Sequence, residues 1–347
     1  MKKSILMVAA IASILFSCSE ENTLSNEDAL SLQNATEVSE IPPSRNCAVM
    51  DVLSVQLQNN PGLEASMNAI EKHAYDFENY LISYKGKPPK GGGGNGGGGG
   101  GTGPTPYTGT INIPVVVHVI YSKVAENISL QQIQSQLDVL NEDYNAQNSD
   151  FGNIPSEFTG VAANVDINFT LAAITRKSSS KTSWGTRNDM KYASQGGVDA
   201  WDSTQYLNIW VCNIGGGILG YAQFPGGAAV TDGVVVGPNY FGRTGVISAP
   251  FDKGRTLTHE VGHWLNLRHI WGDGRCRADD YVSDTPSSDG PNYGCPSYPT
   301  INCKSSDMTM NYMDYVDDAC MYMFSEGQNT RIRALFATGG ARESFVK

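Results

Sequence analysis

Positive charge and long apolar runs are both scarce in this chain of 347 residues. Lysine and arginine number 24 against 35 aspartates and glutamates, which gives a formal net charge of −11. Nucleic-acid binding needs a basic face, so this deficit argues against a nucleic-acid partner. The N-terminal apolar run, Ile5 to Phe16, is too short to span a bilayer. A hydrophobic content of 40% with 17% charged residues nevertheless indicates a folded globular protein.

The short apolar run instead fits the core of an export signal. It follows Lys2 and Lys3 and ends at Leu15-Phe16-Ser17-Cys18, with acidic residues just beyond. This end resembles the lipobox of bacterial lipoproteins, in which the cysteine becomes the lipidated first residue. We therefore expect a lipoprotein signal peptide at residues 1–18 and a membrane anchor at Cys18, at the outer membrane or cell surface. An ordinary cleaved signal, which releases the chain into the medium, is the alternative.

A glycine-rich stretch divides the rest of the chain. Residues 91–103 are almost entirely glycine and cannot bury surface, so they predict a flexible linker. We place a separate N-terminal segment at residues 19–90, the linker at 91–106 and the main domain at 107–347.

The N-terminal segment is expected to contain a helical hairpin. Asn60 and Pro61 form a helix-start signal, and a helix is predicted from Gly62 to Tyr84. Apolar residues recur along it at three- and four-residue spacing, at Leu63, Met67, Ile70, Ala74, Phe77 and Leu81. An amphipathic helix of this kind must dock on another surface.

The main domain mixes strands and helices. The β-branched run Ile113–Tyr121 predicts a buried strand, and a helix is expected from Leu130 to about Tyr144. Val165–Ala172 alternates apolar and polar residues, as a half-buried strand does. Tyr206–Val211 and Gly233–Val236 are further strands. The fold class is therefore α+β, with the strands before residue 240 and an irregular C-terminal part.

The sequence contains five histidines, and three lie within the eleven residues that run from His259 to His269. On a helix, His259 and His263 share one face and can bind one metal ion. Glu260 lies one step round from His259, within reach of a water at the metal. Imidazole nitrogen suits Zn²⁺, and three protein ligands leave a position open for catalysis.

His269 makes this pattern specific, because its spacing is that of the metzincin motif HExxHxxGxxH. The motif's glycine, which turns the chain toward the third histidine, is replaced here by Asn266. Asparagine is the next most tolerated residue in the left-handed conformation, so the turn is still expected.

Further segments resemble the pappalysin family of metzincins, and within it the bacterial cytophagalysin- and ulilysin-like enzymes. Asn311-Tyr312-Met313-Asp314-Tyr315 is similar to the metzincin Met-turn, in which Met313 would lie beneath the zinc. The resemblance also implies that Tyr315 stabilises the oxyanion. Other matching segments are Ile113–Val119, Tyr206–Val211, Gly220–Pro225, Asp284–Pro286 and Cys320–Phe324. The fold that this resemblance implies has a twisted N-terminal sheet, an active-site helix and a disulfide-pinned C-terminal subdomain.

Four of the seven cysteines cluster near the C-terminus, at Cys276, Cys295, Cys303 and Cys320. In an exported protein they predict two disulfides, and their spacing permits three pairings. The pappalysin resemblance implies Cys276–Cys303 and Cys295–Cys320. Cys212 lies in an apolar run and is interpreted as a small buried hydrophobe.

Two further sites follow from the same resemblance. The acidic, turn-rich segment Cys276–Pro286 suits Ca²⁺, with Asp280, Asp284 and Thr285 as candidate ligands, although a solvated acidic loop is the alternative. Arg45-Asn46-Cys47 resembles the family's propeptide signature, which makes residues 19–90 a tether and prosegment. A Cys47 thiolate could occupy the open zinc position and keep the precursor latent.

These observations predict a secreted or surface-anchored zinc endopeptidase that is made as a latent precursor and cleaves protein or peptide substrates. In that reading Glu260 is the general base, and residues 107–347 form the catalytic domain. A surface binding lipoprotein with a non-catalytic zinc site is the first rival, and a zinc hydrolase of non-peptide amides is the second. Some relatives select a basic residue after the cut through an acid just before the last cysteine. Ala319 holds that place here, preceded by Asp317 and Asp318.

Overall fold

The computed structural model describes residues 44–85 and 103–347, and its compact unit covers Pro43–Lys347. The predicted signal peptide, the lipidation site Cys18 and most of the glycine-rich linker lie outside the described residues. No helix among the described residues is long and apolar enough to cross a membrane.

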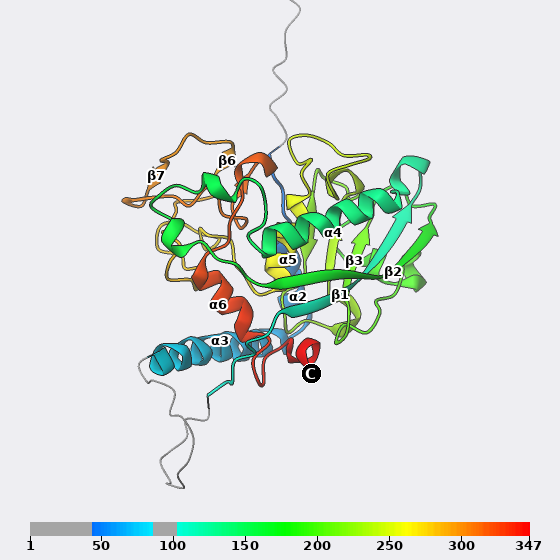
Figure 1. The fold of residues 1–347 in the computed structure, drawn as a ribbon. Coiled ribbons are helices and arrows are strands. Elements are labelled where there is room, and N and C mark those ends of the chain that lie inside the picture. Colours follow the sequence, from blue (N-terminus) through cyan, green and yellow to red (C-terminus); the bar gives the residue numbers. More distant parts are fainter. Residues whose placement is uncertain (1–43, 86–102) are drawn as a thin grey trace, which may run out of the picture. The chain divides into compact units, whose positions relative to one another are not determined.

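A five-stranded twisted sheet forms the centre of the main domain (Figure 1). Its strand order is β2-β1-β3-β5-β4, and the first four strands run parallel. β4 lies at the edge and pairs with β5 in the antiparallel sense. The strands are β1 (Ile111–Tyr121), β2 (Ile167–Ser178), β3 (Leu207–Val211), β4 (Gly220–Ala222) and β5 (Val234–Val236). Parallel strands are typically covered on both faces, which explains why β1, β3 and β5 are almost continuously apolar.

Helix α4 (Leu130–Tyr144) packs across one face of the sheet, against β2 and helix α5 (Arg255–Trp264) (Figure 1). The Ser129 side chain caps α4 by accepting a hydrogen bond of 3.0 Å from the Gln132 amide. Ile133, Leu137 and Leu140 form its buried face. The predicted helix and its apolar face are confirmed.

The C-terminal part has little regular structure before its last helix. Two short strand pairs occur there, β6 (Tyr293–Gly294) with β9 (Tyr315–Val316) and β7 (Ile301–Asn302) with β8 (Ser305–Ser306). Helix α6 (Glu326–Ala334) follows and begins with a capping box between Ser325 and Gln328. Disulfides join Cys276 to Cys303 and Cys295 to Cys320, which is the pairing that the resemblance implied. The α+β class with a disulfide-pinned C-terminal region is therefore correct.

The N-terminal segment forms two helices, α2 (Val49–Asn59) and α3 (Leu63–Lys85), which pack on the main domain. α3 lies alongside α6 (Figure 1). Four residues of its predicted apolar stripe are buried, namely Leu63, Met67, Ala74 and Phe77. Phe77 packs with Ala334 and Ala337 at the end of α6. The amphipathic helix therefore docks through the face that its sequence pattern indicates.

Candidate active site

Helix α5 carries the first half of the histidine motif through the middle of the protein. His259, Glu260 and His263 are each at most 1% exposed. α5 ends in a Schellman motif, because the Leu267 amide donates to the Gly262 carbonyl and the Asn266 amide donates to the His263 carbonyl. Asn266 has a φ of 68°, so the predicted left-handed turn is confirmed. This turn sends the chain back toward the metal-binding face of α5.

The imidazole of His269, which follows the turn, converges with those of His259 and His263 on α5. The Nε2 atom of His263 lies 3.1 Å from Nε2 of His259 and 3.1 Å from Nε2 of His269. Each Nδ1 atom faces an acceptor. His259 meets the Tyr312 carbonyl at 2.7 Å, His263 meets the Leu267 carbonyl at 2.8 Å, and His269 meets the Asp273 carboxylate. These acceptors hold the Nδ1 proton and turn three Nε2 lone pairs toward one point.

The donor set fits a tetrahedral cation. Nitrogen ligands at the usual Zn–N distance lie about 3.3 Å from one another in a tetrahedral site, close to the separations here. Burial and the neighbouring imidazoles lower the pKa of His259 and His263 well below the usual value, so both rings are neutral and able to bind metal at pH 7. Three imidazole nitrogens that converge on one point in a buried site fit a cation between them.

Cys47 approaches the same point from the N-terminal segment. Its Sγ atom belongs, with ligand atoms of His259, His263 and His269, to a group whose members all lie within 4.8 Å of one another. The Cys47 thiol also donates to Glu260 Oε2 over 3.3 Å. On either side of Cys47 the backbone pairs with edge strand β4 and the residue before it, through Ala48 N to Gly220 O (3.1 Å) and Leu219 N to Asn46 O (2.9 Å). The segment thus runs parallel to β4 across the histidine cluster.

Burial sets the protonation of the two groups that face each other there. It raises the pKa of Glu260 to about 8, although the Cys47 thiol and the Arg45 guanidinium oppose the shift. Burial and repulsion by Glu260 raise the pKa of Cys47 well above its usual value.

The Met-turn lies directly beneath α5. Gly262 has no side chain, and a Cβ there would collide with Sδ of Met313. This close approach explains why residue 262, between Glu260 and His263, is a glycine. The spacing of the histidines alone did not reveal that reason. Tyr315 is partly buried, and its ring centroid lies 4.9 Å from that of His269. The Tyr315 hydroxyl donates to the Cys47 carbonyl over 3.2 Å.

The Arg45 side chain is buried beside the histidine cluster, in a site that we call the Asp318 pocket. Its Nη2 atom lies 2.5 Å from Oδ1 of Asp318, and its Nε donates to the Val316 carbonyl over 3.1 Å. The guanidinium carbon also lies 5.0 Å from the centroid of the Phe251 ring. Of the two acids before Ala319, Asp318 is fully buried and Asp317 is only partly so. The sequence could not distinguish them.

Asp318 has a second role at the start of α5. Its Oδ2 atom accepts from the Lys253 amide at 2.9 Å and from the Arg255 amide at 3.1 Å. One carboxylate therefore accepts from the backbone just before α5, from the first amide of α5 and from the Arg45 side chain.

The calcium candidates are arranged around the start of α6. Oδ2 of Asp280 accepts from the Thr285 hydroxyl over 2.7 Å. Asp284 instead accepts from the Ser325 hydroxyl at 2.6 Å and the Gly327 amide at 2.8 Å, which places its carboxylate at the N-terminus of α6. Within residues 44–85 and 103–347, some groups of three or more His, Cys, Asp or Glu side chains bring their ligand atoms within 4.8 Å of one another. Neither Asp280 nor Asp284 belongs to such a group.

The remaining free cysteine, Cys212, and the two other histidines, His118 and His73, pack or form hydrogen bonds elsewhere in the fold. Cys212 is fully buried in a second apolar cluster with Trp210 and Tyr221. His118 lies between the Thr175 hydroxyl at 2.8 Å and the Asn208 side chain at 3.0 Å. His73 contacts the Ala334 carbonyl at 3.0 Å.

Comparison with known proteins gives the same family. The sequence profile described as Pregnancy-associated plasma protein-A matches residues 191–337. Extracellular metalloprotease 1 of Coccidioides posadasii is 35% identical over 240 residues, which cover 65% of this chain and 77% of that protein. An extracellular metalloprotease of Pyricularia oryzae is 34% identical over 239 residues, which cover 65% of this chain and 75% of that protein.

Solved structures agree with the sequence matches. Mature mirolysin of Tannerella forsythia, in complex with a cleaved peptide, has a TM-score of 0.68 and 48% identity, covering 69% of this chain and 96% of that one. A mutant of T. forsythia promirolysin has a TM-score of 0.67 and 48% identity, covering 69% and 85%. The chain therefore belongs to the pregnancy-associated plasma protein-A, or pappalysin, family and is a metalloendopeptidase.

Proposed function

We propose that the chain is a zinc endopeptidase held latent by its own N-terminal segment. The observation that carries this proposal is the convergence of three buried Nε2 atoms beside Glu260, with the Cys47 thiol among them. His259, His263 and His269 would hold Zn²⁺, which supplies a Lewis acid at neutral pH. The division into a prosegment that ends at residue 90, a linker at residues 91–106 and a catalytic domain from residue 107 is part of this proposal.

Three side chains have proposed roles around the reacting peptide bond. Glu260 takes a proton from the attacking water and delivers it to the leaving amine. Tyr315, whose hydroxyl meets the Cys47 carbonyl in the precursor, donates to the developing oxyanion once that carbonyl has left. Met313 supports the floor of the site against Gly262. Once the N-terminal segment has left, edge strand β4 offers a free side on which an extended substrate can pair.

Latency is supported by three separate contacts of the prosegment with the main domain. Cys47 occupies the histidine cluster, Arg45 fills the Asp318 pocket, and α3 packs beside α6. A proenzyme, promirolysin, also occurs among the structures that this chain resembles.

A peptide-library digest tests the proposed function directly. The chain freed of its prosegment and loaded with one equivalent of Zn²⁺ should cleave internal peptide bonds, and removal of the metal should stop cleavage. A binding lipoprotein would leave every peptide intact with zinc bound. A hydrolase of other amides would leave the peptides intact but cleave non-peptide amide substrates.

The Arg45 pocket supports a proposal for specificity. The family resemblance implies that some relatives select a basic residue after the cut, and here the buried Asp318 carboxylate already holds Arg45 beside the histidine cluster. We infer that Asp318 receives an arginine side chain that follows the scissile bond. Peptides that differ only by arginine or citrulline at that position test the charge without changing the enzyme. Equal kcat/KM for the two peptides would refute the role of Asp318.

Export and anchoring are proposed from the N-terminal sequence, and the extracellular relatives support export. We infer that Cys18 carries the lipid that attaches the protein to the outer membrane or cell surface. Metabolic labelling with a palmitate analogue should mark the wild-type chain and leave Cys18→Ala unlabelled. Labelling of the variant would show that the anchor lies elsewhere.

A calcium site is proposed in the segment Cys276–Pro286. Asp280 is 5% exposed, and burial raises its pKa to about 7 even though Arg331 opposes the shift, so its ionised form is short of compensating positive charge. Ca²⁺ bound by Asp280, Thr285 and nearby carbonyl groups would supply that charge, and Asp284 would contribute at the start of α6. Millimolar Ca²⁺ should raise the Tm of wild type, after treatment with a calcium-selective chelator, and have no effect on Asp280→Asn. An unchanged wild-type Tm would exclude the site.

A further inference from the structure

We propose that Arg268 and Arg331 form a carboxylate-binding site on the mature enzyme, which receives an acidic side chain of the substrate well before the scissile bond. The inference rests on the proposed function, because the site opens only when the prosegment leaves. In the precursor, Glu71 of α3 occupies it.

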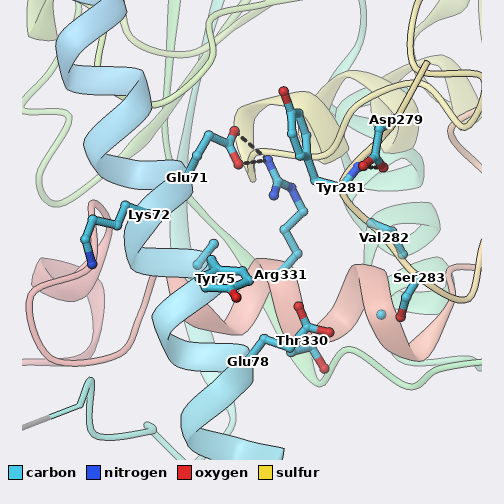
Figure 2. A pocket seen from close by; sticks show the side chains of 12 residues that line it. Glu71, Lys72, Tyr75, Glu78, Asp279, Tyr281, Val282, Ser283, Thr330 and Arg331 are labelled. Carbon is cyan, nitrogen blue, oxygen red and sulfur yellow. Dashed lines mark hydrogen bonds and ion pairs between the residues drawn. The ribbon is translucent and has the colours of Figure 1, made fainter. Parts of the chain in front are cut away.

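Glu71 binds the main domain as an acidic ligand would. Both of its carboxylate oxygens lie against Nη2 of Arg331, at 2.6 Å and 2.5 Å (Figure 2). Nη2 of Arg268 lies 3.7 Å from Oε1, and the Asn266 side-chain amide donates to the same oxygen over 3.5 Å. The α3 helix supplies one carboxylate, and the main domain supplies every donor.

The two arginines are held in place by the main domain itself. Nε of Arg331 donates to the Asn266 carbonyl over 2.7 Å, and its guanidinium carbon lies 5.2 Å from the centroid of the Tyr281 ring. Arg268 stacks over the Phe224 ring at 4.4 Å. Because these contacts involve no prosegment atom, the departure of α3 leaves the arginine pair in position.

Without Glu71, the Arg268 and Arg331 guanidinium groups have too little negative charge around them. Nε of Arg268 is buried and has no hydrogen-bond partner among the described residues. The nearby acids have other partners, since Asp273 contacts His269 and Asp280 accepts from Thr285 and Val282. Arg331 lines a cavity of about 490 Å³ that α3 now borders (Figure 2). Arg268 pairs with the same Glu71 carboxylate, so loss of Glu71 leaves both guanidinium groups without it. An arginine pair of this kind favours a carboxylate over a neutral amide.

The position of the site relative to the catalytic residues predicts where the acid lies in the substrate. Arg45 contacts Thr256 in the first turn of α5, whereas Arg331 binds Asn266 just beyond its last turn. Ten residues of helix separate these points, a distance of about 15 Å. An extended peptide covers that distance in roughly four or five residues. An arginine in the Asp318 pocket therefore places the acid about four or five residues before the scissile bond.

Paired peptides test the site on the mature chain. Each pair carries arginine after the scissile bond and differs only by glutamate or glutamine at the third, fourth, fifth or sixth position before it. Wild type should cleave the glutamate peptide about fivefold faster in kcat/KM at one or more of these positions, and high salt should reduce the preference. Arg268→Gln and Arg331→Gln should bring the ratio to about one, and Arg331→Lys should give an intermediate value.

Arg275→Gln is the matched control, because it removes an exposed arginine that pairs with Asp289 and does not line the cavity. It should keep the wild-type ratio. A variant that is merely misfolded would lower both rates alike and leave the ratio unchanged, which would count against the site. A wild-type ratio of one at all four positions would overturn the inference and leave the proposed peptidase intact. If no peptide is cleaved, the proposed function fails, and fluorescence anisotropy with the same peptides decides whether the arginines prefer glutamate.

Discussion

At the scale of single residues, the chemistry proposed for Glu260 gives a direct prediction. Glu260→Gln keeps the size of the side chain and all three histidines, so it should retain zinc and lose the general base. Peptide cleavage should fall to about 1% of wild type or less, since general acid–base help is worth roughly 10²–10⁴-fold. Metal content by atomic absorption serves as the control. Substantial activity in a zinc-loaded variant would remove Glu260 from this role.

Asn266 gives a second prediction at this scale. Its φ of 68° lies in the left-handed region, where glycine is unstrained and a β-branched residue clashes with the backbone. Asn266→Gly should be neutral or mildly stabilising, whereas Asn266→Val should lower the free energy of unfolding by about 1–3 kcal/mol and weaken zinc binding. Urea unfolding of both variants, with zinc content measured, gives the comparison. A valine variant as stable as wild type would mean that the turn adapts.

The site residues that could be predicted from the sequence are those whose spacing along the chain matches a metal-binding motif. His259, Glu260, His263 and His269 follow a motif, and helix geometry alone brings the first three together. Asp273 and the Arg45–Asp318 pair were not identified as partners, because their roles depend on which backbone lies across from them. The closeness of Met313 to Gly262 is also invisible without the fold, since 51 positions separate them and only a missing Cβ allows the approach.

At the scale of elements, strong local signals gave the best boundaries. Helix α4 runs from Leu130 to Tyr144 as predicted, because its apolar spacing gives a buried face that coincides with a Ser129 cap found in the structure. Strand β2 runs to Ser178, beyond the predicted end at Ala172, because pairing with β1 continues after the alternating pattern weakens. β4 has three residues, and its short sequence contains no periodicity that could have predicted an edge strand.

Asp314, which lies in the Met-turn just before β9, provides a pH-dependent prediction. Asp314 is fully buried and accepts hydrogen bonds from the Asn292 and Tyr315 amides and the Asn292 side chain. Burial raises its pKa to about 7, despite these donors. A carboxyl with a raised folded-state pKa contributes stability below its unfolded pKa of about 3.9, and this contribution is lost as the pH rises through 7.

Asp314→Asn should therefore reduce the loss of stability between pH 5 and pH 8. The variant stays neutral, and rotation of the Asn292 amide restores its hydrogen bond. The difference should be on the order of 2 kcal/mol, or a few degrees in Tm. Wild type and variant are compared by thermal unfolding at both pH values. Some pH dependence should remain, because burial also raises the pKa of Asp143 to about 6 and that of Asp280 to about 7. Identical slopes for the two proteins would show that Asp314 ionises normally.

At the scale of the whole molecule, the proposed prosegment contacts the main domain at sites that are far apart. Arg45 and Cys47 cover the pocket and the histidine cluster, whereas Glu71 and Phe77 attach α3 beside α6. Latency can therefore depend on the thiol at the metal, on the packing of α3, or on both. The two possibilities differ in which single substitution makes the precursor active.

Cys47→Ala separates them, because it removes the thiol and leaves every contact of α3 in place. If the thiol keeps the precursor silent, the freshly purified Cys47→Ala precursor should cleave peptides before processing, or should mature faster than wild type. Phe77→Ala is the matched variant, since it removes a buried ring that packs on Ala334 and Ala337 without touching the histidine cluster. Under the thiol hypothesis the Phe77→Ala precursor stays latent while its prosegment loses stability.

The opposite outcome is equally specific. If α3 alone closes the cleft, Cys47→Ala remains as silent and as slow to mature as wild type, whereas Phe77→Ala combined with Ile70→Ala is active. Zinc content is measured in each precursor, because loss of the thiol must not be confused with loss of the metal. We expect Cys47→Ala to be the more active precursor, since only Cys47 among the prosegment's described residues lies within ligand distance of the three histidines. Activity of the α3 variant alone would assign latency to helix packing.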